Sequence, residues 1–324
     1  MWCPAAGVAG LVGPFLGGLL VDAASWRLVF LINVPFALVI VAVAGRHVPE
    51  SRDPTHHGRF DYLGAVLGAV ALGGVTYALI GAGENATRPD VLVSGAAGLA
   101  AGAAFIARER RAADPMLPPR LFRDRQFTGA NLATLAIYGA LGGSGLFLVL
   151  QLQTVLGYDA TGAGAAMLPS ILLITLLSPY AGAVATRIGP RLPMTAGPLI
   201  VAAGTLLLAA VDGSRPYVVE VLPGSLLQGL GMAVTVAPLT ATVLAAAPDA
   251  LAGIASGVNN AMARAAQLLA VAALPVAVGL SGDDYTRPAA FTDGYRLAMI
   301  ACAALFALGG VVSWWTIRNS VLRS

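Results

Sequence analysis

One arginine stands inside an apolar stretch that is long enough to cross a bilayer. Arg264 is the only ionisable residue of the run 253 to 280, and a charge at such a position costs at least ~2.5 kcal/mol, which makes it a functional candidate. Small and polar residues share its helix face at helical spacing: Gly253, Gly257, Asn260 and Gln267. This stripe predicts a face turned to a cavity or a partner helix. The alternative is a span that begins near Asn259, which leaves Arg264 close enough to cytoplasmic water to snorkel.

Hydroxyl and amide side chains form two further faces at helical spacing. One consists of Gln228, Thr235 and Thr242, and the other of Asn131, Thr134 and Tyr138. Such groups suit an amphiphilic binding surface, but they equally hold helices together at ~0.6 kcal/mol each. Both interpretations stay open from the sequence. The candidates for a cavity or substrate-facing role are Asn131, Tyr138, Gln153, Gln228, Thr235, Asn260 and Arg264.

The remaining reactive side chains predict neither an enzyme nor a metal or cofactor site. All sixteen acids lie in loops or at the ends of apolar runs, and Glu220 is the deepest. His47, His56 and His57 share one loop without the spacing of a zinc site. The chain contains no lysine and no Gly-rich phosphate loop, so ATP-driven transport is not encoded. Its small positive charge does not imply a nucleic-acid partner.

The elements that must position these side chains are membrane-spanning helices. Hydrophobic residues make up 57% of the 324 residues, charged residues only 11%, and the mean hydropathy is +0.79, whereas soluble domains carry ~25% charged residues. Ten continuous apolar runs of the length that a spanning helix needs predict an all-α integral membrane protein rather than a barrel. They are 5 to 22, 27 to 45, 62 to 83, 91 to 107, 128 to 150, 161 to 185, 192 to 211, 217 to 246, 253 to 280 and 295 to 317.

The distribution of arginine predicts the orientation. The connections 46 to 61, 108 to 127 and 186 to 191, together with the C-terminal tail, hold thirteen of the nineteen arginines, whereas the alternate connections hold five. The positive-inside rule then places both termini of this multi-pass chain in the cytoplasm.

The longest basic connection, RERRAADPMLPPRLFRDRQF, divides the chain into four spans and six spans. Its prolines, Pro115, Pro118 and Pro119, exclude a continuous helix through it. Leu121 and Phe122, flanked by arginines, lie either on the inner membrane surface or in a solvated linker.

Two neighbouring motifs near the N-terminus carry a resemblance to a known family. The first is GPFLGG, with Gly13, Pro14, Gly17 and Gly18, in which Gly13 and Gly17 permit close helix approach and Pro14 bends the helix. The second is SWRLVFLINVPFA, with Trp26 and Arg27 at the outer interface and with Asn33 and Pro35 inside the span. Together they resemble the fifth and sixth helices of the fourteen-span drug:proton antiporter family of the major facilitator superfamily.

Later segments resemble that family in the same order. LQLQTVLGYDATGAGAAMLP, which includes Gln153, is similar to its element joining helices nine and ten. SPYAGAVATRIGPR is similar to the second copy of its cytoplasmic loop motif, with matches at Gly182, Arg187, Gly189 and Arg191. Thr186 stands where the family often has Asp, which leaves a charge interlock at this gate unsupported. GLGMAVTVAPLTATVL and GIASGVNNAMARAAQLLAVA resemble helices twelve and thirteen.

The resemblance implies a helical bundle of that superfamily that corresponds to helices five to fourteen, so the chain is expected to be N-terminally truncated by a misplaced start or a real deletion. The implied divisions are 1–45, the last two helices of an N-terminal bundle; 46–126, an additional helix pair with linkers; and 127–324, a complete six-helix bundle. The implied function is efflux of small amphiphilic drug-like compounds across the plasma (inner) membrane, with antibiotic resistance as the result. The implied partners are the lipid bilayer, the small amphiphilic substrate and, in the full-length form, a proton gradient. The alternatives are a non-transporting membrane protein with a structural or partner-binding role, and a ten-span carrier of the drug/metabolite type.

Overall fold

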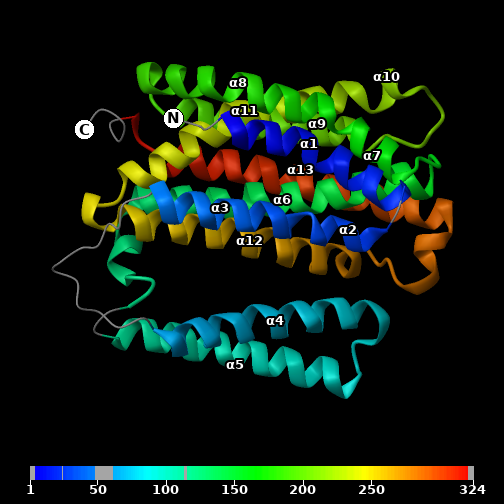
Figure 1. Ribbon diagram of the computed structural model, residues 1–324. Coiled ribbons are helices and arrows are strands. Elements are labelled where there is room, and N and C mark those ends of the chain that lie inside the picture. Colours follow the sequence, from blue (N-terminus) through cyan, green and yellow to red (C-terminus); the bar gives the residue numbers. More distant parts are fainter. Residues whose placement is uncertain (1–3, 24, 48–60, 113–114, 320–324) are drawn as a thin grey trace.

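The computed structural model describes residues 4–23, 25–47, 61–112 and 115–319, and all regular structure in these ranges is helical (Figure 1). The all-α prediction is confirmed. The α-helices are α1 Pro4–Ala23, α2 Trp26–Leu31, α3 Asn33–His47, α4 Tyr62–Asn85, α5 Pro89–Arg111, α6 Arg125–Thr154, α7 Ala160–Ala166, α8 Leu168–Ile188, α9 Arg191–Leu208, α10 Tyr217–Glu220, α11 Leu222–Ala245, α12 Ala252–Ala277 and α13 Pro288–Thr316. Short 3-10 turns are η1 Pro119–Arg123, η2 Asp249–Leu251 and η3 Gly282–Thr286.

Nine of the ten predicted spans coincide with segments that are long and apolar enough to cross a membrane, counted over the described residues. Two of these segments are assembled from consecutive helices: α2 with α3, and α7 with α8. The first predicted span, 5 to 22, coincides with α1, and its crossing of a membrane stays a prediction.

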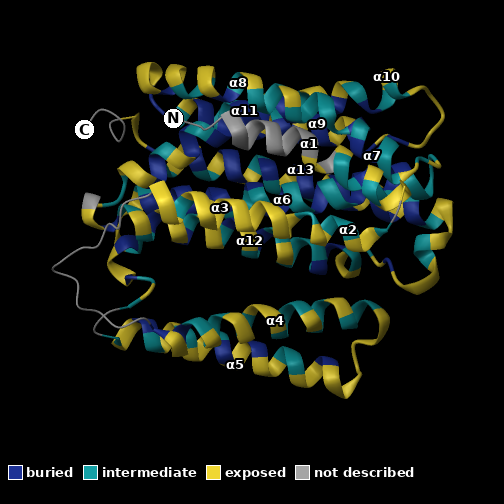
Figure 2. Cartoon of the chain, viewed as in Figure 1, coloured by how far each residue is buried: buried dark blue, intermediate teal, exposed yellow. Residues whose placement is uncertain are grey.

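Six long helices form a packed unit, which we call the C-terminal bundle: α6, α8, α9, α11, α12 and α13. Within it α11 packs on α8 and α9, α13 packs on α6 and α9, and α12 packs on α6. The core is continuous and contains large side chains that are fully buried, among them Phe127, Phe147, Tyr295 and Phe306. Figure 2 shows this buried interior in dark blue, in contrast to the exposed surface of α3.

Glycines allow the backbones of α9 and α11 to touch. A Cβ on Gly197 would approach the carbonyl oxygen of Gly231 to 2.8 Å, and a Cβ on Gly204 would approach that of Gly224 to 2.7 Å. Small residues at such points permit the close packing on which helix association in a membrane depends, because lipid supplies no hydrophobic driving force between helices.

The α4–α5 hairpin lies beside the C-terminal bundle and touches it mainly through α12 (Figure 1). Asp61 holds the base of the hairpin together: its carboxylate caps α4 by accepting from Gly64 N at 2.8 Å and binds the Arg108 guanidinium at 2.8–2.9 Å. The hydrogen bond from Arg108 lowers the pKa of Asp61 from its usual value. The two helices of the hairpin are therefore tied at the end where both meet the basic connections.

The connection between α5 and α6 is broken as its prolines predict, but one residue was misplaced. Leu121 is only 3% exposed and belongs to the protein core, and Phe122 packs edge-to-face on Phe127. Neither of the two alternatives, the membrane surface or a solvated linker, holds for Leu121, because η1 folds the segment back onto the start of α6.

The basic connections that the structure describes converge on one end of the C-terminal bundle. Arg125 donates to the carbonyl oxygen of Trp315 at 2.8 Å, and Arg318 N donates to Gln126 Oε1 at 2.7 Å. Arg191 donates to the carbonyl oxygen of Trp314 at 2.8 Å. The start of α6, the turn between α8 and α9, and the end of α13 thus share one end of the molecule, which we call the basic end.

Candidate functional site

A polar network joins α6 and α12. Asn259 Nδ2 donates to Asn131 Oδ1 at 3.2 Å and to Thr134 Oγ1 at 2.7 Å. Asn131 in turn donates to the carbonyl oxygen of Phe127 at 2.9 Å, and both α6 side chains are buried. Asn131 therefore joins two helices and does not line an open surface, which corrects its assignment as a substrate-facing residue.

Asn259 was missed as a site residue because the sequence argument selected its neighbour, Asn260. Adjacent residues on a helix differ by about 100° in direction, and the structure turns Asn259 toward α6 and leaves Asn260 exposed. Asn259 faces α6 because the two helices pack closely: a Cβ on Gly142 of α6 would lie 3.0 Å from the Cα atom of Gln267.

Arg264 lies at the centre of α12. It is 12 residues from Ala252 and 13 from Ala277, which at 1.5 Å per residue is roughly 18 and 20 Å from the helix ends. A hydrocarbon core of ~30 Å would place the guanidinium near its middle. The helix itself begins at Ala252, seven residues before Asn259, and the choice between a central and a snorkelling Arg264 stays a prediction.

The predicted stripe forms the outward face of α12. Asn260 and Arg264 are exposed, and a Cβ on Gly253 or Gly257 would meet nothing within 4 Å. The one hydrogen bond recorded for the Arg264 side chain is to Gln267 Oε1 at 3.4 Å. A charge in the middle of a spanning helix costs ~2.5–3.5 kcal/mol unless it faces water or a partner, so this face is the strongest candidate for a polar path.

Tyr138 of α6 lies beside this face. It is half-buried, and it lies one helical turn before Gly142, which meets Gln267 of α12. The four residues that the structure gathers on the α6–α12 side are therefore Tyr138, Asn260, Arg264 and Gln267, which we call the central polar site. Their roles in binding stay a prediction.

Thr235 and Gln228 lie inside the C-terminal bundle. Thr235 is fully buried, donates to the carbonyl oxygen of Gly231 at 2.7 Å and faces α9. Gln228 donates across the bundle to Thr205 Oγ1 at 3.1 Å and to Ser144 Oγ at 3.5 Å. Of the two roles that the sequence left open for these side chains, the structure supports helix packing, and their assignment as cavity residues is corrected.

Gln153 is half-buried near the end of α6, and the interior amide is that of Gln151 instead. Gln151 is fully buried and donates to the carbonyl oxygen of Val211 at 2.9 Å and to Thr292 Oγ1 at 3.3 Å. It was missed because both glutamines lie in the same short segment and only the fold shows which one turns inward.

The GPFLGG motif makes its close contact through Gly18. A Cβ on Gly18 would overlap the backbone of Ala160 and Thr161, whereas one on Gly13 or Gly17 would meet nothing within 4 Å. The prediction that Gly13 and Gly17 make the close helix contact is therefore wrong: Gly18 makes it, because α1 turns this residue toward α7. Pro14 lies within α1, but its side chain is outside the described residues.

Asp22 adds a polar lock to this contact and was missed from the sequence. Its carboxylate accepts hydrogen bonds from Thr161 N at 2.7 Å and from Thr161 Oγ1 at 2.6 Å, with a longer one from Ala160 N at 3.4 Å. The end of α1 is thereby fastened to the start of α7, at the end of the molecule opposite the basic end.

The second motif forms a break between two helices. Ser25 caps α2, and the Arg27 guanidinium lies 4.8 Å from the centre of the Trp26 ring, with both side chains exposed as expected at an interface. Asn33 Nδ2 donates to the carbonyl oxygen of Val29 at 3.0 Å. Pro35 lies in the first turn of α3, where its missing N–H is tolerated.

The predicted cytoplasmic loop motif, which joins α8 to α9, is held by a glycine turn and by an arginine that stacks on a tryptophan. Gly189 ends α8 at φ +92°, a conformation that strains other residues. The Arg191 guanidinium stacks 4.1 Å from the centre of the Trp314 ring. Gly182 packs on Ala237 of α11, and Arg187 lies exposed in the last turn of α8. The recorded side-chain contacts of Arg191 are to a carbonyl oxygen and an aromatic ring.

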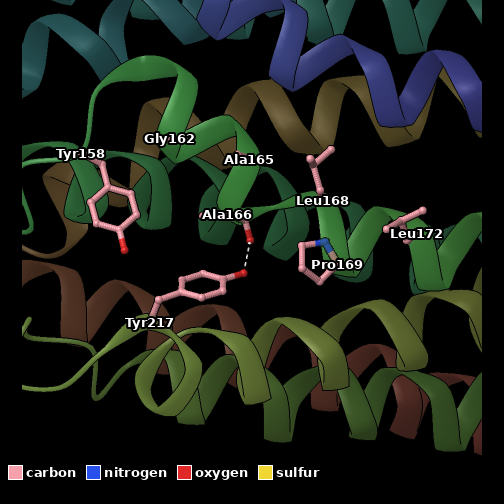
Figure 3. Close-up of a pocket in the computed structure, with 8 residues that line it drawn as sticks. All are labelled: Tyr158, Gly162, Ala165, Ala166, Leu168, Pro169, Leu172 and Tyr217. Carbon is pink, nitrogen blue, oxygen red and sulfur yellow. Dashed lines mark hydrogen bonds between the residues drawn. The ribbon is translucent and has the colours of Figure 1, made fainter.

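Two hollows accompany these elements. One, of about 440 Å³, lies between α7, α8 and α10; Figure 3 shows Tyr158 and Tyr217 in it, with the Tyr217 hydroxyl donating to the carbonyl oxygen of Ala166 at 2.8 Å. The other, of about 430 Å³, lies between α4, α6 and α12, and Leu146, Val271 and Pro275 are among its lining residues. The second shares the α12 face of Arg264, because Val271 and Pro275 follow it by 7 and 11 residues.

In the described residues, no group of three or more His, Cys, Asp or Glu side chains is placed to hold a metal ion. His56 and His57 of the histidine loop lie outside the described residues.

Known proteins show where the chain belongs. Residues 5–271 match the family described as Major Facilitator Superfamily. The chain is 33% identical over 262 residues to the multidrug resistance protein Stp of Mycobacterium tuberculosis, which covers 81% of this chain and 48% of that protein. It is 31% identical over 330 residues to the methylenomycin A resistance protein of Streptomyces coelicolor, covering 100% of this chain and 66% of that protein.

A third relative is the multidrug efflux pump LfrA of Mycolicibacterium smegmatis, 31% identical over 261 residues, or 80% of this chain and 51% of that protein. The chain thus spans about half to two thirds of the length of these curated relatives. The helical fold, the order of the motifs and a family match over most of the chain agree, and the chain belongs to the Major Facilitator Superfamily.

Proposed function

We propose that this chain takes part in efflux of small amphiphilic compounds across the plasma membrane, driven by the proton gradient, with the central polar site forming one wall of the path. The observation that carries the proposal is a polar, charged face at the middle of α12 that turns away from the C-terminal bundle. A structural helix would bury or avoid such a charge, whereas a transporter binds its substrate near the middle of the bilayer, between bundles. The names of the relatives, two of which refer to multidrug resistance or efflux, support the same function.

The convergence of basic connections supports a cytoplasmic position for the basic end. On this orientation the Asp22 contact lies at the outer end, and the exposed stripe of α12 runs from the centre toward the cytoplasm. Compounds would reach the central polar site from the inside, which is the direction that efflux requires.

A second candidate, a non-transporting membrane protein with a structural or partner-binding role, is favoured by one observation. The apolar segment Trp26–His47 buries none of its residues against the rest of the chain. Such a helix is available to lipid or to another membrane helix.

Dye accumulation in a bacterial host without its own efflux pumps distinguishes the two. Cells producing the full chain should accumulate less of an amphiphilic fluorescent dye than cells with an empty vector, and a protonophore should abolish the difference. Arg264→Gln should restore accumulation several-fold. The matched control is Arg296→Gln, which removes an arginine paired with Asp212 at 3.4 Å, and it should keep efflux. Equal accumulation with and without the chain would refute transport and favour the second candidate.

A further inference from the structure

The outward face of α12 carries one positive charge at mid-helix depth, without an acidic residue beside it in the described part of the chain. Arg264 is the only charged residue between the two ends of α12, and α6, α8, α9, α11 and α12 contain no acidic residue at all. On the neighbouring α4, the described acids are Asp61 and Glu84, at opposite ends of the helix. A ligand at mid-helix depth therefore meets a net positive field from the described residues.

The binding capacity of the guanidinium is largely unused by the chain. Arg264 has five N–H donors, and its recorded hydrogen bond is one long contact to Gln267 Oε1 at 3.4 Å. Tyr138 adds a hydroxyl one turn before Gly142, which meets Gln267, and Asn260 adds an amide one turn before Arg264 on the same α12 face. This set suits an acid group, because a planar guanidinium binds carboxylates and similar anions in a bidentate manner.

A mainly apolar chamber lies on the same α12 face. The hollow of about 430 Å³ begins at Val271, which is 7 residues, or roughly 10 Å, beyond Arg264 along the helix. Its walls include Ile80, Leu146 and Leu150. The acid that lines it, Glu84, lies at the far end of α4 and is paired with Arg88 at 3.2 Å. An anionic group at Arg264 and an apolar body in this chamber fit a single amphiphilic molecule of about that length.

We infer, on the basis of the proposed function, that the site takes amphiphilic organic anions: molecules with a carboxylate, sulfonate or phenolate at Arg264 and an aromatic or aliphatic body between α4, α6 and α12. Organic cations of the same shape are repelled by Arg264, which has no carboxylate beside it in the described residues to neutralise it. The substrate class is set by the sign of one charge.

Three probes with the same naphthyl body test the inference: 1-naphthaleneacetate, 1-naphthaleneacetamide and 1-naphthylmethylammonium. Binding to the full chain is measured by titration calorimetry in an uncharged detergent at neutral pH. The acetate should bind at least tenfold more tightly than the amide, and the ammonium more weakly than both. Arg264→Gln should remove the advantage of the acetate, whereas Arg264→Lys should keep most of it.

Two further variants separate the charge from the body. Arg296→Gln removes an arginine at the opposite end from the basic connections and should leave the preference unchanged. Val271→Trp fills the chamber and should weaken all three probes alike.

The results that overturn the inference are distinct from those that overturn transport. Tight binding of the amide or ammonium without a preference for the acetate refutes the substrate class and leaves efflux of other amphiphiles in place. A preference that survives in Arg264→Gln refutes the role of Arg264. Absence of binding for all three probes, together with unchanged dye accumulation in cells, refutes the proposed function itself.

Discussion

The substitution Gly197→Ala tests the packing that holds the C-terminal bundle together. The new Cβ would overlap the Thr235 hydroxyl and would lie 2.8 Å from the carbonyl oxygen of Gly231. A backbone oxygen in a helix cannot swing aside, so α9 must move away from α11. Overpacking of this kind costs about 1–3 kcal/mol. Because alanine favours a helix over glycine by up to about 1 kcal/mol, the net loss is smaller than the clash alone.

A second glycine provides the control for this gain in helix propensity. Gly145 lies within α6, and a Cβ there would meet nothing within 4 Å. Gly145→Ala is therefore expected to be neutral or slightly stabilising, and the difference between the two variants isolates the clash. Thermal unfolding in detergent at a fixed scan rate measures it as a fall of several degrees in the unfolding temperature of Gly197→Ala relative to Gly145→Ala.

A double variant then identifies the atoms responsible. Thr235→Ala removes the hydroxyl that the new Cβ would meet but leaves the Gly231 carbonyl in place. Adding it to Gly197→Ala should recover part of the loss, and the part that remains belongs to the backbone contact. If Gly197→Ala unfolds at the same temperature as Gly145→Ala, the two helices are not in backbone contact and the packing argument fails.

Three more results are expected. In the folded chain Arg108 lowers the pKa of Asp61, so the stabilisation from this carboxylate is present above the ordinary carboxyl pKa and is lost as the pH falls through the lowered value. Asp61→Asn should therefore make the unfolding temperature fall less steeply between roughly pH 7 and pH 3. The same fall in the variant and in the unchanged chain would contradict this. Gly189→Ala should destabilise by ~1–3 kcal/mol, because φ +92° strains a residue with a Cβ; an unchanged unfolding temperature would show that the turn relaxes at no cost. Asp22→Ala should loosen α1 from α7, so that a cysteine at Ala160, whose backbone meets Gly18, reacts faster with a membrane-impermeant maleimide once the native cysteines are replaced; equal rates would argue against the lock.

The spans and the family were predictable because both depend on local sequence. Continuous apolar runs indicate spanning helices without knowledge of their neighbours, and the proline and glycine motifs carried the family. Boundaries were less accurate where polar residues belong to a helix. The last helix begins at Pro288, seven residues before the predicted 295, because Phe291 is fully buried there and anchors a turn whose composition is not apolar.

The site was less predictable because helical spacing shows which residues share a face but not which neighbour covers that face. Thr235 and Arg264 both lie in apolar runs at regular spacing with other polar groups. Gly197 brings the backbone of α9 onto Thr235 and buries it, whereas Arg264 stays exposed among the described residues. Asp22 gave no signal at all, because an acid at the end of an apolar run is also what an ordinary loop shows.

Three described contacts of the helices that precede α6 lie toward the same end of the molecule. Gly18 and Asp22 of α1 meet α7, and Gly83 of α4 lies against Val276 of α12, all toward the end opposite the basic end. At the other end of α12, a Cβ on Gly253 or Gly257 would meet nothing within 4 Å among the described residues. Under the proposed function, this difference between the two ends is the asymmetry that alternating access requires. Release on the far side would then have to break the hydrogen bonds of Asp22 to Thr161, which makes this carboxylate the contact whose strength sets how readily that end opens.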